Sequence, residues 1–281
     1  MASTNQKATL RFGAEVYTWF MKESGQAHAN QLDHMIQVVA QAGFRGIEPM
    51  HFWMGDLRDP GRLAGSLETH GIDLAGLALV LEWNHDGETD EERREADSII
   101  NLLARFPGAM LGMVQMPTSR EDLGERRQRL VRNLSAVAHR AAERGILCSF
   151  HPNSPPTSIA RTPEDYAVLL SGIDRQALGW TPDVGHIANG GMDPLKTMQQ
   201  YAELINHVHY KDWDGSPEFC LMGKGKVNFV GITRWLNDRG YAGWIICEDE
   251  GEEAVDDPDG VTLLDGEWVR TRLLPSMQTR S

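Results

Sequence analysis

Residues 140–151, RAAERGILCSFH, end a polar helical stretch at Gly145 and continue directly into a short apolar segment that closes on His151. A helix that stops at a glycine and is followed by a short apolar strand is one step of a strand–helix repeat. The same order recurs at Gly43, Gly71 and Gly240. Because strands that alternate with helices form parallel sheets, the chain is predicted to be an α/β protein.

Eight apolar segments follow this rhythm and are predicted to be strands, at residues 11–20, 44–49, 72–81, 110–116, 146–151, 178–183, 205–211 and 244–250. Helices are expected at residues 31–42, 60–70, 90–106, 121–144, from 162 onward, and at 194–202, 230–239 and 261–274. Eight units favour closure into a (β/α)8 TIM barrel. The alternative, an open doubly wound sheet, is disfavoured because the chain has neither a G-x-G-x-x-G nor a P-loop motif.

The whole chain fits one domain. Its 281 residues suit a single α/β barrel, and no linker-like stretch divides them. Residues 1–10, MASTNQKATL, are predicted to be a frayed polar tail, and residues 11–281 the barrel.

The composition of the chain limits which classes of partner and which cellular location are expected for the protein. A net charge of -13 disfavours nucleic acid and anionic membrane surfaces as partners. No run of about 18 apolar residues predicts a membrane span. The first ten residues do not resemble a secretory signal, and three cysteines far apart in the sequence fit a reducing cytoplasm.

Four predicted strands end in metal-binding or acid–base side chains. These are His151, Asp183, His209 and Glu248, on the fifth to eighth strands. Active sites of such barrels lie at the carboxyl ends of the strands, and alternation along each strand allows all four side chains to face inward. Two imidazoles and two carboxylates suit Mn, Co, Fe, Ni or Zn better than Mg or Ca. A divalent metal is therefore expected, with manganese first and Co, Fe, Ni, Zn or Mg as alternatives.

At these residues the sequence resembles the sugar isomerase/epimerase superfamily with the xylose-isomerase-like barrel. The matching segments are TPDVGH (181–186), HVHYKDW (207–213), GKGKVNF (223–229) and GYAGWIICEDE (240–250). The resemblance covers residues 140–250 strongly, and the first half mainly in its strand rhythm. It implies a divalent metal, for which Asp183, His209 and Glu248 match the last three ligands.

The fifth strand departs from the pattern of that superfamily. Its sugar epimerases place a glutamate there, as metal ligand and catalytic acid/base, whereas this chain has Ser149 with His151 two residues later. Serine is a poor ligand and no base at neutral pH. His151 is therefore expected to replace the glutamate as ligand, as base, or as both. In this the segment is closer to the inosose dehydratases, and members that cleave C-glycosides by β-elimination point the same way.

Further roles are assigned to residues around this set. His151, with an ordinary pKa near 6.5, and Glu248 are predicted to carry protons, and Lys211 to polarise an oxygen or pair with Asp212. Glu250 is expected to face solvent. His207 is expected to support the shell behind His209. The predicted contacts to substrate are His186, Glu48, Trp213 and Trp19.

The function expected from the sequence is proton removal next to the carbonyl of a keto sugar or cyclitol, with a metal-stabilised enediolate, as in isomerases and epimerases. A lyase acting on a keto-inositol or a 3-keto glycoside is the alternative. A non-catalytic ligand-binding barrel is a further one, and an endonuclease-like hydrolase is disfavoured by the charge. The expected partner is a small-molecule sugar or cyclitol, with a homo-oligomer or a small partner subunit left open.

Overall fold

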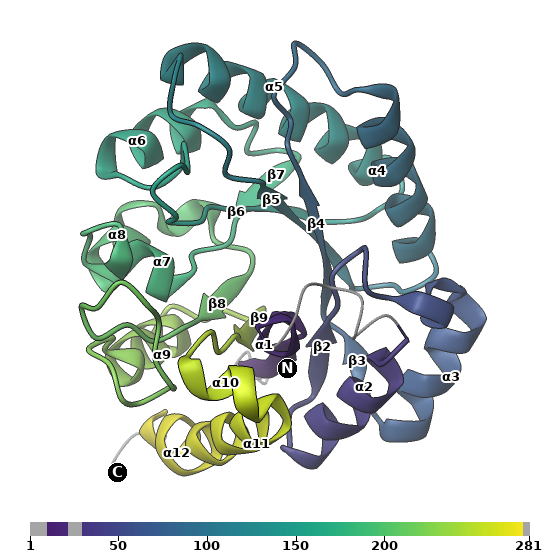
Figure 1. Cartoon of the computed structure of the whole chain (residues 1–281), viewed down its shortest axis with the longest axis vertical. Coiled ribbons are helices and arrows are strands. Elements are labelled where there is room, and N and C mark those ends of the chain that lie inside the picture. The colour runs from purple at the N-terminus through teal and green to yellow at the C-terminus, as the bar shows by residue number, and fades with distance from the viewer. Residues whose placement is uncertain (1–9, 22–29, 278–281) are drawn as a thin grey trace, which may run out of the picture.

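A computed structural model describes residues 10–21 and 30–277 of the chain. Parallel strands form a central barrel, and helices form a ring around it (Figure 1). The strands are β1 (Arg11–Glu15), β2 (Gly46–Glu48), β3 (Asp73–Leu74), β4 (Gly76–Leu81), β5 (Met110–Gln115), β6 (Cys148–His151), β7 (Leu178–Trp180), β8 (Val208–Tyr210) and β9 (Trp244–Cys247).

The outer layer consists mainly of helices that follow the strands. They are α1 (Tyr17–Phe20), α2 (Leu32–Gln41), α3 (Pro60–His70), α4 (Asp90–Leu103), α5 (Leu123–Ala142), α6 (Pro163–Gly172), α7 (Val184–Asn189), α8 (Pro194–Gln200), α9 (Phe229–Asp238), α10 (Glu252–Asp256), α11 (Pro258–Trp268) and α12 (Leu274–Ser276). Two short 3₁₀ helices, Gly55–Arg58 and Ala202–Leu204, and a π-helical turn, Val269–Leu273, complete them. Among the described helices, none is both long and apolar enough to cross a membrane.

The barrel closes through two sheets that meet at both edges. One sheet has the order β3-β2-β1-β9-β8 and the other β4-β5-β6-β7, with every pairing parallel. Isolated bridges join them, Met50 to Ala78 at one edge and Trp180 to Ile205 at the other. β3 and β4 are one strand interrupted at Ala75, so the barrel has the eight predicted strands and the TIM-barrel prediction is confirmed.

Helix boundaries follow the capping signals in the sequence. Thr162 caps α6 by accepting a hydrogen bond from the backbone N–H of Asp165, whose side chain returns the bond. Thr89 and Glu92 do the same for α4, and α3 ends at Gly71 in the left-handed conformation. These local signals explain why the helices begin and end close to the predicted residues.

Some boundaries differ from the sequence prediction. The first predicted strand, residues 11–20, ends at Glu15, because the chain turns into α1 directly afterwards. The short helices α7 and α10 were not predicted, because five or six residues leave no periodic pattern. Residues 1–9 of the predicted tail lie outside the described residues, whereas Leu10 is buried.

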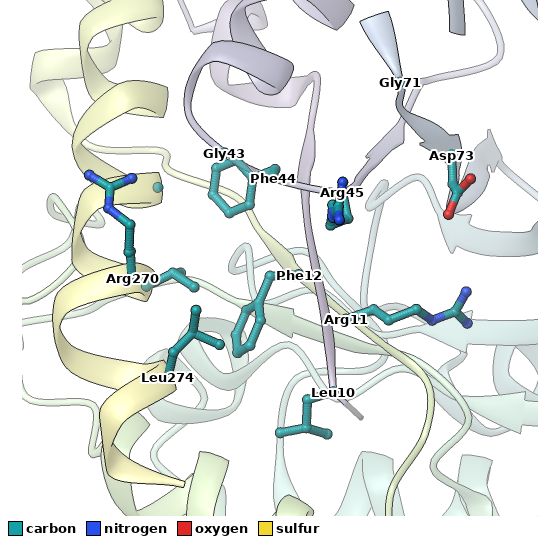
Figure 2. A pocket seen from close by; sticks show the side chains of 12 residues that line it. Leu10, Arg11, Phe12, Gly43, Phe44, Arg45, Gly71, Asp73, Arg270 and Leu274 are labelled. Carbon is teal, nitrogen blue, oxygen red and sulfur yellow. The ribbon is translucent and has the colours of Figure 1, made fainter. Parts of the chain in front are cut away.

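The two ends of the barrel differ in chemistry. At the amino-terminal end, a hollow of about 560 Å³ is lined by apolar side chains such as Phe12 and Phe44 and by three arginines (Figure 2). Asp73 is the one carboxylate among the described residues that line it. This end therefore offers no paired acid and base, and the candidate site lies at the opposite end.

The contact between α11 and the end of α2 depends on a glycine. A Cβ at Gly266 would lie 2.1 Å from the backbone oxygen of Ala42, which cannot move aside as a side chain would. We expect Gly266→Ala to lower the free energy of unfolding by about 1–3 kcal/mol, the usual cost of overpacking. Urea denaturation measures this change.

The matched control is Gly65→Ala in α3, where an added Cβ meets nothing within 4 Å. Replacing an unconstrained helical glycine should raise the free energy of unfolding by about 0.5–1 kcal/mol. Equal stability changes in the two variants would contradict the close packing of α11 on α2.

Candidate functional site

A cavity of about 300 Å³ opens at the carboxyl ends of the strands. Polar and apolar side chains both line it, and the exposed side chains of Phe52 and Met116 are among the apolar ones. The polar residues that line it are Glu15, Tyr17, Glu48, His151, Asn153, Thr181, His186, His209, Glu248 and Glu250. No lysine or arginine is among the described lining residues, so the cavity wall is acidic.

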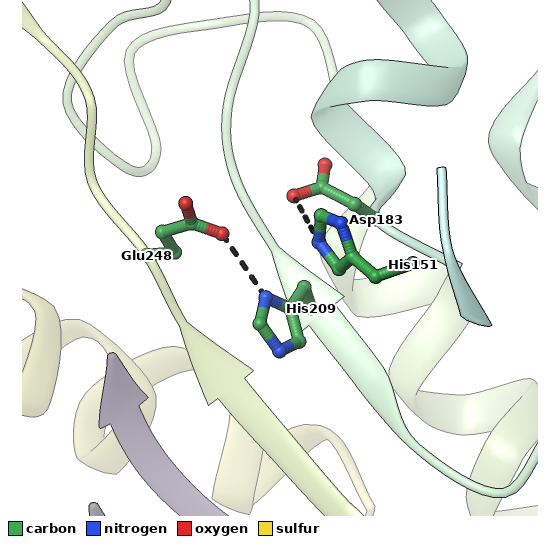
Figure 3. A group of neighbouring side chains, drawn as sticks. All are labelled: His151, Asp183, His209 and Glu248. Atoms are coloured by element: carbon green, nitrogen blue, oxygen red, sulfur yellow. Dashed lines mark hydrogen bonds and ion pairs between the residues drawn. The ribbon is translucent and has the colours of Figure 1, made fainter. Parts of the chain in front are cut away.

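The four predicted ligands meet on one side of this cavity. One ligand atom from each of His151, Asp183, His209 and Glu248 lies within 4.8 Å of those from the other three. His209 Nδ1 lies 3.0 Å from Glu248 Oε2, and His151 Nε2 lies 3.6 Å from Asp183 Oδ2 (Figure 3). The four residues come from four consecutive strand ends, so the barrel register alone brings them together.

The cluster fits a divalent metal by its own chemistry. Both ring nitrogens of His151 and Oδ2 of Asp183 are buried without a hydrogen-bond partner, although buried polar atoms are nearly always paired. Carboxyl groups of Glu15, Glu48, Glu248 and Glu250 line the cavity, and that of Asp183 belongs to the cluster beside it. Among the described residues, Lys211 is the one buried lysine. A cation at the cluster would satisfy the unpaired atoms and offset the negative charge of Asp183 and Glu248.

Lys211 lies behind the cluster instead of in the cavity wall. Its Nζ is 3.0 Å from Glu248 Oε1 and 3.4 Å from Asp183 Oδ2, and it also contacts Glu250. Burial by itself would raise the pKa of Asp183, but the ammonium of Lys211 outweighs it and holds that pKa well below its usual range. Lys211 therefore keeps Asp183 and Glu248 ionised and in place. It does not pair with Asp212, which accepts backbone N–H bonds from the loop at residues 213–227.

His186 sits at the start of α7 and lines the cavity. Its backbone N–H donates to Asp183 at 2.8 Å, and its ring nitrogens lie 2.9 Å from Ser154 Oγ and 3.2 Å from Lys211 Nζ. Burial, helped by Lys211, lowers the pKa of His186 to about 3. The ring is therefore neutral, and both of its nitrogens have partners within the protein.

Ser149 is not available to a ligand. It is fully buried below His151, and its Oγ accepts a hydrogen bond of 2.6 Å from Thr181 Oγ1. The residue two positions further along β6, His151, is the one that reaches the cavity.

Glu48, predicted to contact substrate, lies at the cavity floor against two histidines. Its carboxylate is 2.6 Å from His207 Nε2 and 3.3 Å from His209 Nε2. Burial opposes ionisation of Glu48, but the two histidines hold its pKa well below the usual range. Glu48 thus contacts His209 on the side of the ring opposite Glu248.

Neither Trp19 nor Trp213, both predicted as substrate contacts, lines the cavity. Trp19 is buried in α1, where its indole N–H donates to Asp259 at 2.7 Å. Trp213 donates to the backbone oxygen of Ser216 and lines a separate hollow beside α8 and α9. Each side chain turns away from the cavity because an oxygen outside it satisfies the indole N–H.

Two carboxyl groups of the site were not assigned from the sequence. Glu15 ends β1, and burial together with Glu248 raises its pKa well above the usual range. Glu250 was expected to face solvent, but it lines the cavity and contacts Lys211. The signal for Glu15 was the same as for Glu48, an acidic residue at the end of an apolar strand, but the predicted strand ran past it.

Comparison with known proteins assigns the chain to a family. The family profile described as xylose isomerase-like TIM barrel matches residues 36–272. The chain belongs to this family. Inosose dehydratase from Geobacillus kaustophilus (strain HTA426) is 26% identical over 271 residues, which cover 84% of this chain and 86% of the relative.

Solved structures share the same fold. The IOLI protein with a binding zinc atom superposes with a TM-score of 0.74 at 13% identity, over 96% of this chain and 99% of that one. D-psicose 3-epimerase from Clostridium cellulolyticum H10 gives 0.71 at 16% identity, over 92% and 99%. At these identities the likeness concerns the fold.

A metal at the cluster should stabilise the folded protein. We expect Mn²⁺, Co²⁺ or Zn²⁺ at about 100 times its dissociation constant to add roughly 2.7 kcal/mol, visible as a higher melting temperature. Asp183→Asn should abolish most of this gain, because it removes a ligand charge.

Asp183 also caps α7, so the control is Asp193→Asn, which weakens the equivalent cap of α8 on the surface. Asp193→Asn should retain the full gain from metal. An equal gain in wild type and Asp183→Asn would count against a metal at this cluster.

Proposed function

We propose that this protein is a divalent-metal-dependent lyase acting on a keto-cyclitol or keto sugar. In the proposed reaction, a base removes the proton on the carbon next to the carbonyl, and the hydroxyl on the following carbon leaves as water. The name of the inosose dehydratase relative supports this choice, because that chain is matched over most of its length.

The observation that carries the proposal is that the His151 side chain reaches the cavity without a hydrogen-bond partner. It is 6% exposed, lines the cavity and has no hydrogen-bond partner on either ring nitrogen. An unpaired imidazole that reaches a cavity is suited to act as a general base. The glutamate that a two-glutamate epimerase would use on this strand is absent, because Ser149 stands there and is hydrogen-bonded to Thr181.

Asp183, His209 and Glu248 would hold the metal, with His151 beside it. The metal, when bound, would act as a Lewis acid on the substrate's carbonyl and hydroxyl oxygens. We propose manganese first, with zinc, cobalt, iron or nickel as alternatives for a mixed nitrogen and oxygen ligand set.

Glu250 is the proposed acid for the leaving group. It lines the cavity, and burial raises its pKa to about 8 even though Lys211 lies against it. It is therefore largely protonated at neutral pH. The balance is complete without a further reactant: His151 receives the proton from carbon, Glu250 protonates the departing hydroxide, and a carbon–carbon double bond forms.

The cavity is suited to a neutral polyol of monosaccharide size. About 300 Å³ is the lower end of the range for small-molecule sites. Because the described lining has no lysine or arginine, a phosphorylated sugar would lack a counter-charge. We therefore propose an unphosphorylated substrate. Three free cysteines, two of them buried, fit the proposed cytoplasmic location.

Isomerisation or epimerisation is the second candidate, because it starts with the same proton removal. Glu15 and Glu248 provide a second proton-carrying pair in the same cavity, which reprotonation at another position would use. The two outcomes differ only in whether the β-hydroxyl leaves.

Substitution of His151 tests its role as base. With a keto-inositol and saturating Mn²⁺, we expect His151→Ala to lower kcat by roughly 10²–10⁴-fold, the usual contribution of a positioned base. Product is followed by the ultraviolet absorbance of the conjugated ketone, and bound metal by elemental analysis. Metal should remain on the three other ligands at saturating concentration.

The control is His85→Ala, which removes an exposed histidine outside the described cavity lining. Its kcat should equal that of wild type. Full activity of His151→Ala at saturating metal would make His151 a ligand only and remove the proposed base.

A further inference from the structure

We infer that Glu48 and His207 form a positioning pair that fixes the orientation of His209. This inference rests on the proposed metal site, and it assigns a role to two residues outside the proposed ligand set. Glu48 ends β2, His209 lies in β8 and His207 directly precedes β8, so the pair spans the barrel interior.

The geometry is that of a buried row of three polar side chains. His207 Nε2 is hydrogen-bonded to Glu48 Oε2 at 2.6 Å, and the other carboxylate oxygen lies 3.3 Å from His209 Nε2, an ion-pair contact. The opposite ring nitrogen of His209, Nδ1, faces Glu248 at 3.0 Å. Each of the three residues in the row is at most 2% exposed.

These contacts orient the ring of His209. Nε2 is turned toward the Glu48 carboxylate, and Nδ1 is turned toward Glu248 and the proposed metal cluster. A carboxylate only accepts hydrogen bonds, so Nε2 of His207 donates to Glu48. Metal-binding histidines commonly have their other ring nitrogen beside a carboxylate, as His209 has.

The barrel makes room for the Glu48 carboxylate. A Cβ at Gly76 would lie 3.0 Å from Glu48 Oε2, and one at Gly112 would lie 3.4 Å from Oε1. These glycines stand on β4 and β5, where barrel interiors usually carry branched apolar side chains. The interior at this level is thus built around a charged group and its two imidazoles.

A second metal ion at this position is the competing interpretation. Ligand atoms of Glu48, His207 and His209 lie within 4.8 Å of one another. However, the 2.6 Å between His207 Nε2 and Glu48 Oε2 is a hydrogen-bond distance. Two ligands of one ion at about 2.1 Å each stand roughly 3 Å apart or more. The separation therefore favours the positioning role.

The first test measures metal affinity in wild type and Glu48→Gln, with Co²⁺ as a visible probe and elemental analysis for stoichiometry. We expect Glu48→Gln to weaken Co²⁺ binding about 10–100-fold while keeping one ion per chain. The melting temperature of the metal-free protein should not fall in parallel, as it would for a merely structural residue. His207→Gln should weaken binding in the same direction.

Glu82→Gln is the control, because it removes an exposed carboxylate beyond the end of β4 without touching either histidine. It should leave Co²⁺ affinity unchanged. Affinity of Glu48→Gln within twofold of wild type would overturn the inference. Two ions per chain in wild type and one in Glu48→Gln would also overturn it, in favour of the second metal site.

The second test needs no metal. In long-range ¹H–¹⁵N spectra of the metal-free protein, Nε2 of His207 should be protonated in wild type, and His207 should become a mixture of tautomers in Glu48→Gln. An unprotonated Nε2 of His207 in wild type would overturn the inference. If wild type binds no Co²⁺, the proposed function fails, while this spectrum still decides the role of Glu48.

Discussion

The structure of the site depends on one electrostatic constraint, the burial of several carboxylates in one small cavity. Asp183 and Glu248 share the ammonium of Lys211, and Glu48 is held by His207 and His209. Burying a charge without a partner costs several kcal/mol, so each carboxylate must be paired or neutralised. A divalent cation in contact with two of them is the simplest way to complete the balance.

This constraint also explains features of the fold. The interior of the barrel is not filled by branched side chains at the level of Glu48, where glycines on β4 and β5 leave space. Lys211 is fully enclosed behind the strand ends, although lysine is rarely buried. Charged groups thus replace part of the apolar packing next to the cavity and hold its side chains in place, as is common where a site is built into a stable scaffold.

The sequence was sufficient for the fold and for the four-residue cluster. Repeated glycine-terminated helices gave the strand count, and strand alternation placed His151 and Asp183 on the inner face. Contacts across the barrel were harder to predict from the sequence, because Glu48 and His207 are 159 residues apart and no local pattern joins them. The side-chain direction of Trp19 depended on a distant acceptor, Asp259, which sequence spacing does not show. The position of Glu250 in the cavity could not be predicted, because it depends on how deep the cavity is, and that depth follows from the loops more than from the strands.

The central claim is that this cavity removes a proton from the carbon beside a carbonyl, and isotope exchange tests it most directly. A keto-inositol would be incubated with the manganese-loaded protein in D₂O and followed by proton NMR. We expect the signal of the proton next to the carbonyl to disappear faster than in buffer with Mn²⁺ alone, together with a new vinyl signal if water is lost. An unchanged signal over many turnover times for each keto-inositol and keto sugar offered would contradict it.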